Sequence, residues 1–139
     1  MLQQVHEHIV NELQQNTRTD TIFVVTAIAF NLIVLGINSS VASEASRARA
    51  NASDDMILIV FIIMSLLVNT IAIIALNTGR MSREKLIQGL LSMYKDNDVA
   101  QYYDASLVAG YGRRYLLFTG VILCLAITSI VVPLIIRFV

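Results

Sequence analysis

Three long stretches of this sequence lack charge. Asp, Glu, Lys, Arg and His are all absent from residues 21–37, 56–76 and 115–136, and charged residues make up only 14% of the chain, against about 25% in ordinary globular proteins. A helix in the core of a soluble bundle keeps a polar face, and these stretches have none. The pattern therefore argues against a water-soluble helical bundle.

Each uncharged stretch is long enough to cross a bilayer as a helix. At about 1.5 Å per residue the three stretches reach roughly 25–33 Å, and a hydrocarbon core about 30 Å thick is crossed by roughly 17–25 residues. The stretch 21–37 meets this requirement only narrowly. We therefore predict an all-α integral membrane bundle that forms one domain over 1–139, with transmembrane helices at 21–37, 56–76 and 115–136.

The chain is also poor in residues that carry chemistry. Its single cysteine, Cys124, cannot close an intrachain disulfide, and inside the third span it is best interpreted as a packing residue. The spans contain no histidine that would ligate haem and no ionisable residue of the kind used in proton relays. A phosphate-binding glycine loop and a nucleophile elbow are both missing. We therefore expect neither enzymatic activity nor a cofactor.

Partners that bind through charge are not favoured either. Lys+Arg 10 and Asp+Glu 10 give a net charge of zero, so the chain has no electrostatic attraction for nucleic acid. Near the N-terminus His8 and Glu12 lie one helical turn apart, but two ligands do not form a site. Val10 interrupts the His-Glu-x-x-His pattern of metalloproteases. We therefore predict no metal site.

The polar segments outside the spans are expected to be partly helical. Apolar residues at helical spacing predict an amphipathic helix over 2–17, which lies either along the membrane interface or against the connector between the second and third spans. These apolar residues are Leu2, Val5, Ile9 and Leu13.

The two connectors between the spans differ in character. Residues 38–55 are rich in Ser, Ala and Asn and are predicted to form a solvated external loop. Residues 77–114 are predicted to form a helical cytoplasmic connector, whose first helix ends at an Asp-Asn-Asp run. A second, short helix is expected over 99–108, ended by Gly110 and Gly112.

The basic residues predict the orientation, because Lys and Arg are retained on the cytoplasmic side of a membrane. One face of the membrane would hold Arg18, Arg80, Arg83, Lys85, Lys95, Arg113 and Arg114, and the other Arg47, Arg49 and Arg137. We therefore predict a multi-pass protein of the cell inner membrane, with a cytoplasmic N-terminus and an external C-terminus.

Small polar side chains lie within or at the ends of the first two spans. Such groups must find partners in hydrocarbon, where water is absent. One interpretation is that they bond across helices and set the helix register, at about 0.6 kcal/mol per bond; the other is that they line a hydrated path for ions or a small solute. The residues are Asn31, Asn38, Ser65, Asn69 and Asn77, with Asn31 and Ser65 expected at similar depth and Asn69 about one turn nearer the cytoplasm.

Two further sets of residues are candidate contacts. Small residues at four-residue steps let helix backbones approach closely, either within the chain or between subunits. Basic residues near the membrane surface hold anionic headgroups or a partner, at about 1 kcal/mol each, or serve only to fix the topology. The first set is Gly120, Cys124 and Thr128, and the second is Arg80, Arg83, Lys85, Arg113 and Arg114.

These observations favour assembly as the function. Three helices enclose too little space for a pore, and polar residues on all three favour further partners. We expect a non-catalytic membrane protein, surrounded by the lipid bilayer, that acts as a homo-oligomer or as a subunit of a larger membrane complex. The alternative is an oligomeric ion or small-solute channel whose pore is lined by the amides of the first two spans.

Overall fold

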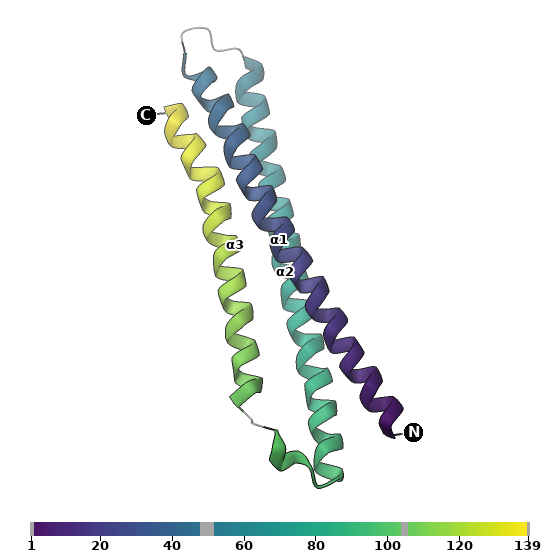
Figure 1. The fold of residues 1–139 in the computed structure, drawn as a ribbon. Helices are drawn as coiled ribbons and strands as arrows, with labels where there is room; N and C mark the ends of the chain where they lie inside the picture. The colour runs from purple at the N-terminus through teal and green to yellow at the C-terminus, as the bar shows by residue number, and fades with distance from the viewer. Residues whose placement is uncertain (1, 48–51, 104–105, 139) are drawn as a thin grey trace.

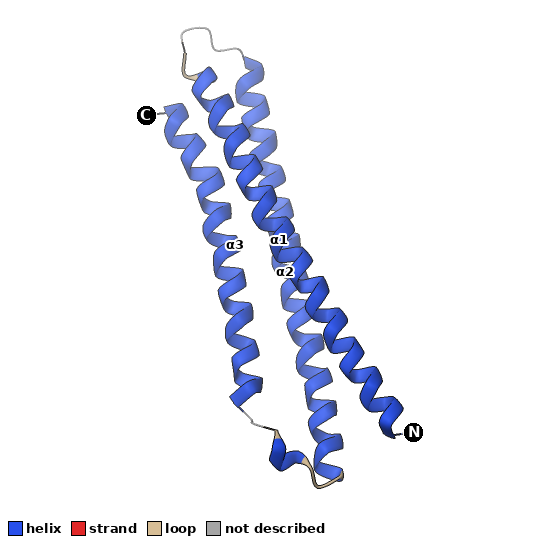
Figure 2. Cartoon of the chain, viewed as in Figure 1, coloured by secondary structure: helices blue, strands red, loops and turns tan. Residues whose placement is uncertain are grey.

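The computed structural model describes residues 2–47, 52–103 and 106–138. Within these ranges the chain forms three long α-helices and one short 3-10 turn, and no strand (Figure 2). The elements are α1 (Leu2–Ala45), α2 (Ala52–Asp96), η1 (Ala100–Tyr102) and α3 (Ser106–Phe138). The helices lie up, down and up, so that the N-terminus is near the α2–α3 connection and the C-terminus near the α1–α2 connection (Figure 1).

α1 combines two elements that the sequence analysis separates. The predicted amphipathic helix 2–17 and the first span 21–37 form one continuous helix of 44 residues, which is about 66 Å long. The residues between them, Arg18, Thr19 and Asp20, do not end the helix, because none of them is a Gly or Pro. The hydroxyls of Thr17 and Thr21 bond back to the carbonyls four residues earlier, each at 2.9 Å.

α2 likewise continues beyond its span. It covers the stretch 56–76 and runs on to Asp96, where the expected break is present. The helix ends in a turn in which Asp98 adopts a left-handed φ of 56° and the amide of Val99 donates to the Tyr94 carbonyl at 3.0 Å.

The connections are shorter than the sequence analysis predicts. α1 runs on to Ala45 and α2 begins at Ala52, so helix occupies most of the predicted external loop 38–55. The predicted helix over 99–108, ended by two glycines, is wrong: α3 begins at Ser106 and passes through both. A glycine costs a helix only about 1 kcal/mol, which is too little to end one that continues into a long apolar stretch.

The helices pack through one seam each, with buried residues three or four positions apart, as in a coiled coil. α1 packs against both other helices. The buried apolar residues of the seam include Val24, Ala27, Val34, Ala72, Leu76, Tyr115 and Ile122.

The outward faces of the three helices are also apolar. Ile33 is 60% exposed, Leu67 56% and Leu116 70%. Soluble monomers rarely expose continuous apolar surfaces of this kind. All three helices are long enough and apolar enough to cross a membrane.

Candidate functional site

Four polar side chains meet at the centre of the bundle and form what we call the amide cluster: Asn31 of α1, Ser65 and Asn69 of α2, and Ser129 of α3. Asn31 and Asn69 bond reciprocally. The Asn31 amide nitrogen donates to the Asn69 side-chain oxygen at 2.7 Å, and the Asn69 nitrogen donates to the Asn31 oxygen at 2.9 Å. All four residues are buried.

Backbone carbonyls accept hydrogen bonds from the remaining N–H groups of the two amides. Asn31 also donates to the Ala27 carbonyl at 2.8 Å, and Asn69 to the Ser65 carbonyl at 2.7 Å. Ser129 joins α3 to the cluster, because its hydroxyl lies 3.2 Å from that of Ser65. The amide cluster therefore links all three helices at one level.

The cluster differs in two respects from the sequence-based expectation. Asn31 bonds directly to Asn69, which was expected about one turn nearer the cytoplasm. Ser129 was missed, because a hydroxyl in an apolar span carries little signal; its position seven residues after the seam residue Ile122 was the only indication.

The other two candidate amides lie outside the cluster. Asn38, seven residues after Asn31 on the same face of α1, is fully buried. Neither atom of its amide group has a hydrogen-bond partner among the described residues. Asn77 is exposed on α2.

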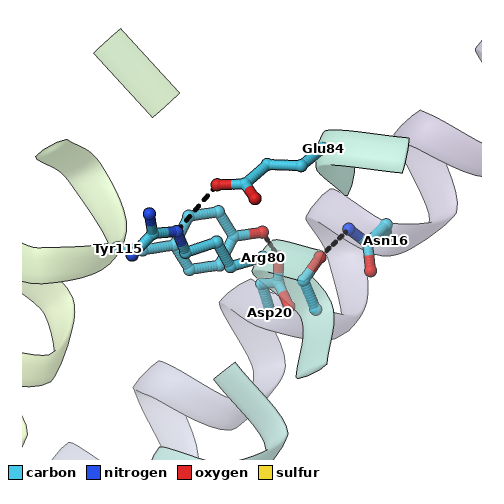
Figure 3. A network of polar contacts seen from close by, with 6 residues as sticks. Asn16, Asp20, Arg80, Glu84 and Tyr115 are labelled. Carbon is cyan, nitrogen blue, oxygen red and sulfur yellow. Dashed lines mark hydrogen bonds and ion pairs between the residues drawn. The ribbon is translucent and has the colours of Figure 1, made fainter. Parts of the chain in front are cut away.

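A second group of residues lies at one end of the three apolar stretches, and we call it the boundary cluster: Asn16, Thr17 and Asp20 of α1, Gly79 and Arg83 of α2, and Tyr115 of α3. The Tyr115 hydroxyl donates to the Asp20 carboxylate, and the Asn16 amide donates to the Gly79 carbonyl at 2.9 Å (Figure 3). Asp20 is only 7% exposed although it is a carboxylate. This cluster therefore joins the three helices at a second level.

Gly79 permits this close approach of α1 and α2. A Cβ atom at Gly79 would collide with the Asp20 carboxylate, which the Tyr115 hydroxyl holds in place. A residue with a side chain at this position would displace Asp20 or move the two helices apart. The requirement is specific to Gly79, because a Cβ at Gly89 of the same helix meets nothing within 4 Å.

Arg83 supplies the positive charge of the boundary cluster. It donates to the Thr17 hydroxyl at 2.7 Å and its guanidinium lies 4.2 Å from the centre of the Tyr111 ring. Burial raises the pKa of the Asp20 carboxyl above its ordinary value; the hydrogen bond from Tyr115 and the charge of Arg83 counteract only part of that effect. The arrangement fixes helix positions at the edge of the apolar region.

The other basic candidates are spread around the same end of the spans. Arg80 forms an ion pair with Glu84 at 2.9 Å on the surface of α2 (Figure 3). Arg114 lines a cavity of about 60 Å³ next to Asp20. Lys85 and Arg113 are exposed. Of the five, only Arg83 belongs to the boundary cluster.

The predicted small-residue seam of α3 is not packed against the other two helices. Cys124 is exposed, and a Cβ at Gly120 would meet nothing within 4 Å. Among the described residues Thr128 bonds only to the Cys124 carbonyl of its own helix, at 2.8 Å. Within the chain α3 packs through Ile122 and its neighbours instead, so these small residues do not form an intramolecular seam. Their contact with another subunit stays a prediction.

Contacts at the two ends close the bundle. Far from the spans, the His6 ring nitrogen lies 3.0 Å from the Tyr94 hydroxyl, so the N-terminal part of α1 packs on α2. At the opposite end Arg137 pairs with Asp55 at 2.8 Å, and the hydrogen bond from Arg137 lowers the pKa of the Asp55 carboxyl.

No protein-family model, no curated protein and no solved structure matches this chain.

Proposed function

We propose that this protein is a non-catalytic integral membrane subunit that acts by helix assembly. Its three apolar stretches cross the bilayer. The polar parts of α1 and α2 extend together on the cytoplasmic side, and the C-terminus lies outside. The apolar outward faces support insertion, because lipid tails would solvate side chains that water would not. Most of the basic residues lie at the end of the spans where the boundary cluster is found, which supports the orientation.

One observation carries the choice of assembly over conduction. Inside the bundle Asn31 and Asn69 bond to each other, and each also bonds to a carbonyl of its own helix. A pore wall needs donors and acceptors that are free to bind a permeating ion or solute, and all four N–H groups of these two amides donate within the bundle. The amide cluster therefore acts as a register device for the three helices, which leaves the outer surface for partners.

The small outward face of α3 is where we place the contact with a second copy or another subunit. Cys124 is exposed on that face, and small side chains such as those of Cys124 and Thr128 let a neighbouring backbone approach closely. Since Cys124 is the only cysteine, a disulfide between two copies reports their contact directly.

The test is oxidative cross-linking of the protein in its own membranes. We expect the protein to stay in the membrane pellet after alkaline carbonate washing, and Cys124 to give a covalent dimer. The matched control is Ile33→Cys in a Cys124→Ala background, since Ile33 is exposed on a different helix. Extraction of the protein by carbonate would show that it is not inserted in the membrane. If the Ile33→Cys variant forms as much covalent dimer as the wild type does through Cys124, the cross-link reports random collision and the proposed α3 contact is wrong.

The channel alternative has its own test. Purified protein in liposomes should give no flux above empty liposomes. A flux that Asn31→Leu or Asn69→Leu alters would overturn the assembly proposal in favour of conduction.

A further inference from the structure

A groove between α2 and α3 opens on the outside of the bundle and encloses about 600 Å³. This volume is within the range of about 300–1,000 Å³ that ligand sites in proteins occupy. Its walls include Ile74, Leu116 and Leu123, which are 60%, 70% and 45% exposed. A groove with such walls, at the depth of the apolar stretches, suits a hydrocarbon chain.

One end of the groove is polar. Asn77, Thr78 and Arg80 line it at the level where the second apolar stretch ends. Arg80 reaches from α2 to α3, where its Nη2 lies 3.8 Å from the position that a Cβ on Gly112 would take. The ion pair with Glu84 engages the Nε of Arg80, and a surface pair of this type contributes only about 0.3–0.5 kcal/mol.

The groove thus combines an apolar channel with a cation at the membrane surface. From Tyr115 to Leu123 it follows α3 for about 12 Å into the apolar region. Basic pockets between membrane helices bind anionic lipid headgroups on the cytoplasmic side. We propose that this groove binds one anionic phospholipid, with its phosphate at Arg80 and an acyl chain along α3.

Charge complementarity selects a lipid over a second copy of this chain as the occupant. The apolar stretches carry no acidic residue that would face Arg80 from a neighbouring copy. At the boundary level a second copy presents mainly further Arg and Lys side chains, and its Asp20 is buried. A phospholipid supplies both a phosphate for the guanidinium nitrogens that Glu84 does not engage and the apolar chain. This inference rests on the membrane insertion that the proposed function includes.

The open floor of the groove provides a steric test. A Cβ on Gly120 would meet nothing within 4 Å, and Gly120 lines the groove. Gly120→Leu therefore fills the groove without a clash inside the bundle. Gly36→Leu is the matched control, since a Cβ on Gly36 also meets nothing within 4 Å but Gly36 lies on α1.

The charge test uses Arg80→Gln, with Arg113→Gln as its control. Both changes remove one positive charge at the same end of the bundle, but the exposed Arg113 is not part of the groove lining. Purified protein is equilibrated with equal amounts of phosphatidylglycerol and phosphatidylcholine of identical acyl chains. Retained lipid is then counted by native mass spectrometry.

We expect one retained phospholipid per chain and about a fivefold preference for phosphatidylglycerol, which corresponds to about 1 kcal/mol for one basic side chain. Arg80→Gln should bring the preference close to one, and Gly120→Leu should lower the retention of both lipids. The control variants Arg113→Gln and Gly36→Leu should behave like the wild type.

Besides a wild type that retains no lipid, three results would overturn the proposal. They are equal retention of the two lipids by the wild type, an equal effect of Arg80→Gln and Arg113→Gln, and a dimer without lipid that Gly120→Leu dissociates. Carbonate extraction of the wild type separates the two levels of the argument. If carbonate extracts the protein, both proposals are wrong. If the protein stays in the membrane but retains no lipid, only the proposal about the groove is wrong.

Discussion

Two asparagines on one face of α1 should respond in opposite directions to the same substitution. Asn31 is buried and bonded to Asn69, whereas Asn38, seven residues later, is buried without a partner among the described residues. Asn31→Leu removes two reciprocal bonds, which at about 0.6 kcal/mol each are worth about 1.2 kcal/mol in a membrane protein. Asn38→Leu removes an unbonded amide whose burial costs about 1–3 kcal/mol.

The comparison cancels most of the steric effect of the larger side chain, because the added volume is the same at both positions. The free energy of unfolding of Asn38→Leu should therefore exceed that of Asn31→Leu by about 2–4 kcal/mol. The assay is reversible unfolding in mixed micelles, with sodium dodecyl sulfate titrated into dodecyl maltoside and helix content followed by circular dichroism.

Thr70→Val is the control, because it removes a polar group without removing a hydrogen bond between helices. Thr70 follows Asn69 on α2 and is exposed, and within the described part of the chain it bonds only to the Leu66 carbonyl of its own helix, at 2.7 Å. Its substitution should change the free energy of unfolding by no more than about 0.5 kcal/mol. Equal effects of the Asn31 and Asn38 substitutions would refute the reasoning, since hydrogen bonding would then not distinguish the two sites.

Two further predictions concern the contacts at the boundary and at the opposite end of the bundle. Gly79→Ala should destabilise the protein in the same assay because the new Cβ displaces the Asp20 carboxylate, whereas Gly89→Ala should stabilise it by about 0.5–1 kcal/mol through helix propensity; a stabilising Gly79→Ala would contradict the close approach of α1 and α2. Because Arg137 holds the pKa of Asp55 below its ordinary value of 3.8, this pair stabilises the fold above that pH and its contribution is lost as the pH falls further. The wild type should therefore exceed Asp55→Asn in stability at pH 7 and lose that advantage below pH 3.8; an advantage that is constant with pH would show that the ion pair is not its source.

The helical spans were predictable because their signal is local. An uncharged stretch such as 56–76 is visible in the sequence as composition alone, and each of the three stretches lies within a long apolar helix. The continuity of α1 was not predictable in this way. The residues around Arg18 are polar but helix-compatible, so the sequence change marks a change of surroundings rather than an end of helix.

The boundary cluster was missed because its partners are far apart in the sequence. Asp20 and Tyr115 are 95 positions apart, and neither belongs to a motif. The pairing of Asn31 with Asn69 was easier to predict from the sequence, because the middles of antiparallel spans lie at similar depth. Which residue of α2 bonds to Asn31 still depends on how each helix is rotated about its axis. The spacing of the residues and the composition do not determine that rotation.

The continuous helices also have a mechanical consequence. With the apolar stretches fixed in a bilayer, residues 2–20 of α1 form a rigid arm of about 28 Å beyond them. A change of about 10° in the tilt of the first span would carry the tip of this arm sideways by about 5 Å. A change in the tilt of the first span inside the bilayer would thus move the surface near His6 and Tyr94, together with any partner bound there.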